Sequence, residues 1–210
     1  MPFELTEEEG SYLVKLARQA IEKRLRTGQS ISIPKDAPTK LAEKCGVFVT
    51  LNSISSGKKE LRGCIGFAAP VMPLVKATID AAIGAAVGDP RFPQVELNEL
   101  SSIVVEVSVL TPPELISAKT PTEYPKLIRI GKDGLIVERG WSSGLLLPQV
   151  PVEWDWNEEE FLSHCCLKAG LSPDSWLVPG IKIYRFQAII FEEEIPNGKV
   201  KRVQLPESSR

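Results

Sequence analysis

The stretch from residue 46 to residue 67 limits the fold most strongly, because it reads as two strands joined by a polar turn. GVFVTLNS opens at Gly46 as a β-branched and aromatic run, ISSGKKE follows as the turn, and LRGCIGF is a second run. Two such runs around a short turn that contains glycine predict an antiparallel β-hairpin. We therefore expect paired strands over residues 47–53 and 61–67.

The second of these strands combines a cation, a thiol and two glycines. Side chains alternate in an extended strand, so Arg62, Cys64 and Gly66 are expected on one face. At a rise of ~3.3 Å per residue the guanidinium lies roughly 6–7 Å from the sulfur along the chain, and a nearby cation favours the reactive thiolate. Gly63 and Gly66 leave open backbone that a ligand can approach. Cys64 and Arg62 are therefore candidate catalytic residues, and Arg62, Gly63 and Gly66 candidate ligand-binding residues.

Ordinary explanations of the same two side chains stay open. Cysteine is among the most buried residue types and often packs as a small hydrophobe, which would account for Cys64. Arg62 also suits a surface ion pair with Glu60 or with an acid across the hairpin.

Three further polar residues are candidates for ligand binding. Glu106 lies in IVVEVSVL, residues 103–110, whose apolar residues on both faces predict a central strand. A carboxylate in such a strand must find a partner or lie at a cleft. Asp89 and Arg91 are held two residues apart in the tight turn DPRF, and this turn is also compatible with a local salt bridge.

Capping signals place the helices. A capping box predicts a helix over residues 7–26 that stops at Gly28, and Asn157 with Glu160 predicts another that runs to about residue 169 and closes at Gly170. Residues 74–87 form an apolar run that predicts a helix buried on most sides.

Further strands are expected in four places. They are a hairpin of LIRI and LIVE around Asp133-Gly134, a buried strand or loop over residues 140–148, a long strand over 181–193 and a short edge strand through Asn197-Gly198. Strands and helices do not alternate regularly, which favours an α+β fold with mainly antiparallel sheets over a parallel one. The chain has neither a fixed repeat nor a low-complexity linker, so we expect interlocked elements rather than separable domains.

Charge and composition bound the function. The formal net charge of the 210 residues is −2, which counts against a general nucleic-acid binder because such proteins need a strong basic excess. The start, MPFELTEEEG, lacks a signal-peptide pattern, and no apolar run approaches the ~18 residues of a membrane span. We expect a cytoplasmic protein. Its four cysteines form no CxxC motif and are too few for a disulfide framework, so we expect reduced thiols.

The single histidine, His164, precedes two cysteines, but adjacent residues of a helix project ~100° apart and cannot converge on one ion. We therefore predict no metal site. Cys165 falls at core spacing, whereas His164 aligns with Glu160 and Lys168 on a polar face. A Cys64–His164 dyad stays open, since catalytic partners can be distant in sequence. The four tryptophans are expected to pack in the core rather than to stack on bases.

Several segments, in order, resemble the AMMECR domain family, which is named after a human chromosomal region linked to Alport syndrome with midface hypoplasia and elliptocytosis. They are GVFVTL, LRGCIG, DPRFPQV, SVLTPPE, LLLPQV and KAGL, and LRGCIG is the signature of the family. The resemblance covers about residues 13–192. It implies a single AMMECR-type domain over residues 1–205, two-lobed with a larger and a smaller lobe, mainly antiparallel sheets and flanking helices, followed by a loose tail at 206–210.

The resemblance implies associated proteins but no particular activity. Some relatives are fused to, or encoded with, Memo-type proteins and radical S-adenosylmethionine proteins, which are therefore the partners that it implies. No cofactor follows from it, and whether the protein is an enzyme stays open.

Two alternative functions are compatible with these residues. In the first, a cleft around Arg62 and Cys64 binds an anionic small molecule or a modified peptide, with Arg62 as the charge-assisted contact and Cys64 as the nucleophile or acceptor thiol of any reaction. In the alternative, the protein is a non-catalytic interaction module in which the LRGCIG strand is structural or a partner surface.

Overall fold

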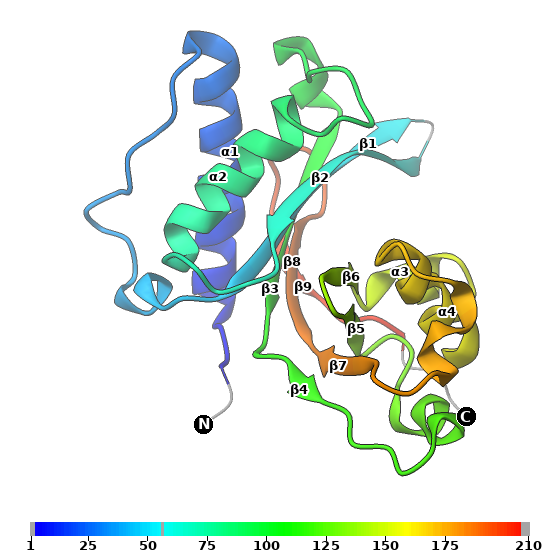
Figure 1. Cartoon of the computed structure of the whole chain (residues 1–210). Helices are drawn as coiled ribbons and strands as arrows, with labels where there is room; N and C mark the ends of the chain where they lie inside the picture. The colour runs from blue at the N-terminus through cyan, green and yellow to red at the C-terminus, as the bar shows by residue number, and fades with distance from the viewer. Residues whose placement is uncertain (1–2, 56, 207–210) are drawn as a thin grey trace. The chain divides into compact units, whose positions relative to one another are not determined.

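The computed structural model describes residues 3–55 and 57–206, and it divides the chain into two units, each with its own sheet. Unit 1 is Met1–Leu110 with Ile189–Val203, and unit 2 is Thr111–Ala188 with Gln204–Arg210. The fold is α+β with antiparallel sheets, as the sequence predicts (Figure 1).

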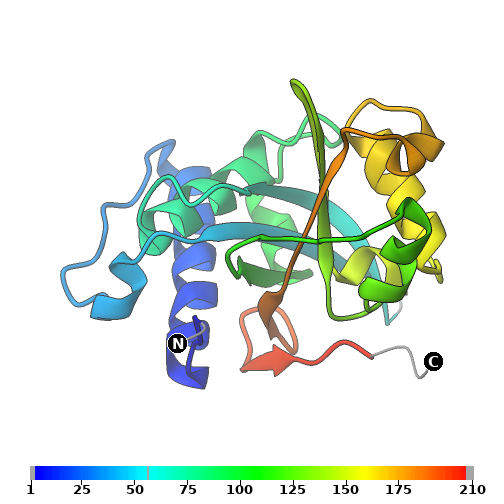
Figure 2. The ribbon, with the colours of Figure 1, turned by 60° about the horizontal axis from the view of Figure 1, so that its bottom comes forward.

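Unit 1 is built on a five-stranded sheet of order β2-β1-β3-β8-β9. Its strands are β1 (Gly46–Ser55), β2 (Lys58–Phe67), β3 (Ile103–Leu110), β8 (Ala188–Glu193) and β9 (Val200–Val203). The expected hairpin is confirmed as β1 paired with β2, and the expected central strand as β3, which pairs with β1. The expected edge strand is β9, drawn in red in Figure 2, and it lies near the N-terminal helix.

Two long helices cover one face of this sheet (Figure 1). They are α1 (Glu7–Thr27) and α2 (Leu74–Val87), and two short 3-10 helices, η1 (Thr39–Ala42) and η2 (Leu97–Ser101), flank them. α1 begins at the predicted capping box of Thr6 and Glu9, and it ends at Gly28, whose φ of 69° is left-handed. Leu13, Val49 and Ile79 are fully buried between helices and sheet, and each such side chain contributes about 1.5–3 kcal/mol by leaving water.

Unit 2 has a four-stranded sheet of order β4-β7-β5-β6 with small helices packed on it. The strands are β4 (Glu114–Leu115), β5 (Gly134–Arg139), β6 (Ser142–Leu146) and β7 (Lys182–Phe186). The helices are η3 (Pro121–Leu127), α3 (Gln149–Glu153), α4 (Glu158–Lys168) and η4 (Pro173–Leu177). The predicted cap of α4 is confirmed, because the Asn157 side chain accepts hydrogen bonds from the backbone amides of Glu159 and Glu160. Cys165 is fully buried, as expected for a packing residue.

The prediction of a hairpin around Asp133-Gly134 is wrong. Residues 128–133 form no strand, and β5 pairs instead with β6, across a turn at Gly140 whose φ is 59°. The Asp133 carboxylate, fully buried, accepts a hydrogen bond from the backbone amide of Arg129 at 3.0 Å. This local side-chain bond favours a turn over a strand at residues 129–133.

The long strand expected over residues 181–193 is also divided. It is β7 in the sheet of unit 2 and β8 in the sheet of unit 1, separated by Gln187. The backbone of Gln187 is held by Thr111, whose amide donates to its carbonyl and whose hydroxyl accepts from its amide, both at 2.8 Å. The backbone of Gln187 therefore bonds with Thr111, which follows β3, and does not continue the strand pairing of β7 or β8.

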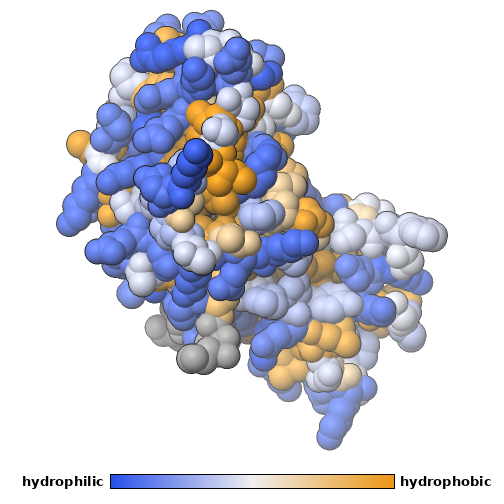
Figure 3. Space-filling view, turned by 90° about the vertical axis from the view of Figure 1, so that its left-hand side faces the viewer, coloured by the Kyte–Doolittle hydropathy of each residue, from blue (hydrophilic) through white to orange (hydrophobic). Residues whose placement is uncertain are grey.

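One face of the molecule is mainly polar (Figure 3). On the face that Figure 3 displays, hydrophilic side chains surround smaller hydrophobic areas. Among the described residues, none of the helices combines the length and the apolar character needed to cross a bilayer. Residues 207–210 of the expected loose tail lie outside the described residues.

Candidate functional site

A β-bulge in the hairpin decides where the LRGCIG side chains point. Cys64 lies opposite Thr50, but the register then shifts, so that Gly63 is opposite Leu51 and Leu61 is opposite Asn52. Arg62 is the extra residue, and such a residue interrupts the alternation of faces. Since Asn52 shares a face with Thr50, Leu61 lies on the face of Cys64. The regular alternation that predicts one shared face for Arg62 and Cys64 is therefore broken at Arg62.

The guanidinium of Arg62 binds the segment that follows α2. Its Nε and Nη2 donate to the two carboxylate oxygens of Glu99 at 2.8 and 3.0 Å, and Nη1 donates to the carbonyl of Pro93 at 2.8 Å. The side chain is 14% exposed. Hydrogen bonding to Arg62 is the main reason why the pKa of Glu99 is lowered. Arg62 thus forms an ion pair, as the alternative explanation predicts, but the partner of Arg62 is Glu99 and not Glu60 or an acid across the hairpin.

Asp89 and Arg91 bind the backbone of Cys64 on the outer edge of β2. The Asp89 carboxylate accepts a hydrogen bond from the Cys64 amide at 2.8 Å, and Arg91 Nη2 donates to the Cys64 carbonyl at 3.4 Å. Arg91 also donates to both oxygens of Asp89, at 3.0 and 2.7 Å. β2 is an edge strand, so these side chains satisfy backbone groups that a neighbouring strand would otherwise bind. The hydrogen bond from Arg91 is the largest cause that holds the pKa of Asp89 well below its usual range.

The surroundings of the Cys64 thiol disfavour its ionisation. Burial has the largest effect and raises the pKa of Cys64. The hydrogen bond from Thr50 and the charge of Arg91 lower this pKa, and the charges of Glu106 and Asp89, which have the smallest effects, raise it. The Thr50 hydroxyl donates a hydrogen bond to the sulfur at 3.4 Å. The expectation that a neighbouring Arg62 favours the thiolate is wrong, and the cation that acts on this thiol is Arg91.

Glu106 extends a polar row across three strands. Thr50 lies opposite Cys64 on one side and opposite Glu106 on the other, so the three side chains follow one another across β2, β1 and β3. Ser108, two residues along β3, donates a hydrogen bond to Glu106 Oε1 at 3.1 Å. The structure thus brings the predicted residues Cys64 and Glu106 together through Thr50.

The two glycines of the motif serve packing. A Cβ at Gly63 would lie 2.1 Å from the carbonyl oxygen of Ala85 in α2, and a Cβ at Gly66 would lie 2.4 Å from the ring of Phe48. The open backbone expected at these positions is therefore filled by the chain itself. Gly63 in particular lets α2 approach β2 closely.

His164 and the tryptophans lie in unit 2. The imidazole of His164 stacks on Trp156 with ring centroids 3.7 Å apart and planes 2° apart. The Cys64–His164 dyad, whose members belong to different units, stays a prediction. Within residues 3–55 and 57–206, no group of three His, Cys, Asp or Glu side chains could hold a metal ion. Trp176 is buried as expected, but Trp141 and Trp154 are exposed, so the prediction of core packing is wrong for both.

Two residues of the site were missed by the sequence argument. Thr50 could have been found, since pairing the two predicted strands places it opposite or next to Cys64. Glu99 could not, because nothing in the sequence links it to Arg62, which lies 37 residues away.

Comparisons with known proteins agree with this fold. The family model described as AMMECR1 matches residues 14–191. Protein PH0010 of Pyrococcus horikoshii is 60% identical over 206 residues, which cover 98% of this chain and 100% of that protein. Protein MJ0810 of Methanocaldococcus jannaschii is 57% identical over 196 residues, or 93% and 96% of the two chains. The crystal structure of uncharacterized protein PH0010 superimposes with a TM-score of 0.92, covering 97% of this chain and 100% of that one. The chain belongs to the AMMECR1 family.

Proposed function

We propose that unit 1 is a binding domain for a small molecule or peptide segment with an anionic group, which lies over the row of Cys64, Thr50 and Glu106. The charge-assisted contact comes from Arg91. The observation that carries the proposal is the position of this guanidinium, which acts on the Cys64 thiol and is still 51% exposed.

Arg91 suits an anion better than Arg62 does. Every guanidinium nitrogen of Arg62 is used by Glu99 or a backbone carbonyl. In the part of the chain that the structure describes, Nη1 of Arg91 makes no hydrogen bond, while Nε and Nη2 are fixed by Asp89. A guanidinium already held in place loses little freedom when it binds a carboxylate or phosphate.

The raised pKa of the Cys64 thiol favours non-covalent binding of the ligand over a covalent reaction. The nucleophilic form of cysteine is the thiolate, and a raised pKa disfavours it. A neutral thiol bonded to Thr50 instead supplies a soft, weakly polar wall to a ligand. A reaction at Cys64 would require a faster thiol, and the rate of alkylation by iodoacetamide tests this.

The alternative, a non-catalytic interaction module, is favoured by a different observation. Arg62, Gly63, Gly66 and the Cys64 backbone each serve the packing of unit 1, as a purely structural motif would. Under this alternative, substitutions at Arg91 alter stability or partner binding and no small anion binds. From the family resemblance we further propose a cytoplasmic location and partners of the Memo or radical S-adenosylmethionine type, which co-purification from a native host would test.

The test is a titration of the ¹⁵N-labelled full chain with inorganic phosphate and with acetate, against sodium chloride at equal ionic strength. We expect saturable shifts of the Arg91 Nε–H and Cys64 amide signals in the wild-type chain. The shift of the Cys64 amide should be weakened in Arg91→Lys and lost in Arg91→Gln. Arg202→Gln is the matched control, because Arg202 is an exposed arginine of unit 1 paired with Glu4. Shifts no larger than those with chloride, or equal shifts in the Arg91 variants, would reject the proposal.

A further inference from the structure

Unit 2 contains a series of three stacked rings, of which one end, Trp154, is exposed. Trp154 and Trp156 stack with centroids 6.2 Å apart and planes 20° apart, and Trp156 stacks in turn on His164. Trp156 packs against the core of unit 2, whereas Trp154 is 67% exposed. Leaving a large aromatic side chain in water forgoes stabilisation that burial would supply. Trp154 is thus the member of the series without a structural explanation.

The backbone holds the two indoles in a defined turn. After α3 the amide of Trp154 donates to the carbonyl of Val150 at 3.2 Å, and the amide of Trp156 donates to that of Pro151 at 2.9 Å. Between them Asp155 has a φ of 53°, in the left-handed region that aspartate tolerates better than most residues. Trp154 is therefore presented by a fixed turn, which limits the ordering cost of binding.

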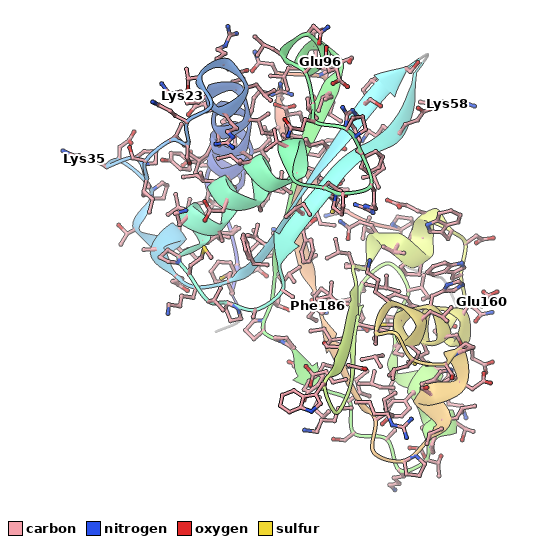
Figure 4. The ribbon with its side chains drawn as sticks, turned by 45° about the horizontal axis from the view of Figure 1, so that its top comes forward. Lys23, Lys35, Lys58, Glu96, Glu160 and Phe186 are labelled. Carbon is pink, nitrogen blue, oxygen red and sulfur yellow. The ribbon has the colours of Figure 1, made fainter. Side chains whose placement is uncertain are left out.

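The segment that carries the two indoles has only negatively charged side chains. Residues 149–160 read QVPVEWDWNEEE, with five carboxylates and no Lys, Arg or His. Four of these are exposed, namely Glu153, Asp155, Glu159 and Glu160. Figure 4 shows the labelled Glu160 on the outer side of α4. Such a surface repels the phosphates of a nucleotide and attracts a cation.

We propose that the Trp154 surface, defined as Trp154, Trp156 and His164 with the carboxylates of Glu153, Asp155 and Glu159, docks an arginine-bearing segment of a partner protein. The guanidinium stacks on the indole of Trp154, since tryptophan is the best ring for a cation. Arginine is favoured over lysine because its planar group stacks on a ring and also binds carboxylates with its fork of donors. This inference does not depend on the Arg91 site of unit 1.

The test uses the ¹⁵N-labelled full chain, whose four tryptophans give four indole Nε1–H signals. The probe is the peptide acetyl-Gly-Arg-Gly-Arg-Gly-amide, compared with its lysine and glutamate versions and with AMP. We expect saturable shifts of the Trp154 and Trp156 signals only. Trp154→Ala should weaken binding about two- to fivefold, the equivalent of an exposed cation–π contact, and Glu159→Gln should weaken it less.

Trp141→Ala is the matched control, because Trp141 is a fully exposed tryptophan of the same unit at the β5–β6 turn. It should leave the affinity unchanged. Equal shifts at Trp141 and Trp154, or an unchanged affinity in Trp154→Ala, would overturn the proposal. So would tighter binding of AMP or of the lysine or glutamate peptide. Trp154 is exposed, so its variant should keep the wild-type unfolding temperature, and this measurement confirms that the comparison is made on folded protein.

Discussion

The carboxylate of Asp89 accepts a hydrogen bond from the backbone amide of Cys64 at 2.8 Å, so the turn after α2 completes the outer edge of β2. Arg91 extends this contact to the Cys64 carbonyl, and Glu99 binds Arg62, two residues away on the same strand. The segment from residue 89 to residue 99 therefore acts as the neighbour that the edge strand lacks. In physical terms, the LRGCIG strand and the DPRFPQV segment form one structural unit.

The Asp89 contact predicts a loss of stability in acid. The folded pKa of Asp89 lies well below its ordinary value of 3.8, and that of Glu99 below 4.5. Between the folded and unfolded pKa values the unfolded chain binds more protons, so the free energy of unfolding falls as the pH drops below about 4. Asp89→Asn should lower this free energy at pH 7 by roughly 1–3 kcal/mol and should flatten its pH dependence. Urea unfolding between pH 3 and 7 measures both, and an unchanged acid slope in Asp89→Asn would contradict the assignment.

The close approach of α2 to β2 predicts unequal costs for two glycine substitutions. In Gly63→Ala the new methyl group meets the backbone oxygen of Ala85 at 2.1 Å, whereas in Gly84→Ala it meets the side chain of Ile65 at 2.9 Å. A side chain can move aside more easily than a helix backbone. Gly63→Ala should therefore cost about 1–3 kcal/mol or more, and Gly84→Ala clearly less. Denaturant midpoints of the two variants give the comparison, and the reverse order would show that α2 moves freely.

The raised pKa of Cys64 predicts a slow thiol. The other three cysteines are buried, and Cys64 is partly exposed, so iodoacetamide should modify the folded chain mainly at Cys64. The rate at pH 7.5 should be below that of glutathione and should still be rising above pH 9, since the thiolate is the form that reacts. Cys64→Ser should remove this labelling, and peptide mass mapping identifies the modified residue. A Cys64 that reacts faster than glutathione would restore the activated-cysteine hypothesis.

Local signals in the sequence were enough for much of the fold. The capping boxes at Thr6 and Asn157 begin α1 and α4, and each depends on residues within one turn of helix. The hairpin and β3 followed from short runs of β-branched residues with nearby turns. Such features can be predicted because the interactions that fix them lie close together in the chain.

The remaining features depend on contacts between residues distant in sequence or, in one case, on a local hydrogen bond from a side chain that competes with strand formation. The bulge at Arg62 is a property of the paired strands, and the Arg62–Glu99 ion pair joins residues 37 apart. The hairpin at Asp133 failed because that carboxylate binds the Arg129 amide. The predicted site residues therefore lie on the strand or turn that the sequence indicates, while Arg62 pairs with Glu99 and the cation that acts on Cys64 is Arg91.

A buried ion pair between α1 and β8 gives the last prediction. Arg18 donates to both carboxylate oxygens of Glu193 at 2.5 Å, and the two side chains are 5% and 2% exposed. Arg18→Met leaves the Glu193 charge buried without its cation, which should cost about 3–5 kcal/mol. Arg202→Ala, in the exposed pair with Glu4, should cost no more than about 1 kcal/mol. Urea unfolding of both variants at pH 7 makes the comparison. Equal costs would mean that Glu193 reaches water or another cation once Arg18 is removed, and that the pair does not fasten the first helix to the strand near the C-terminus.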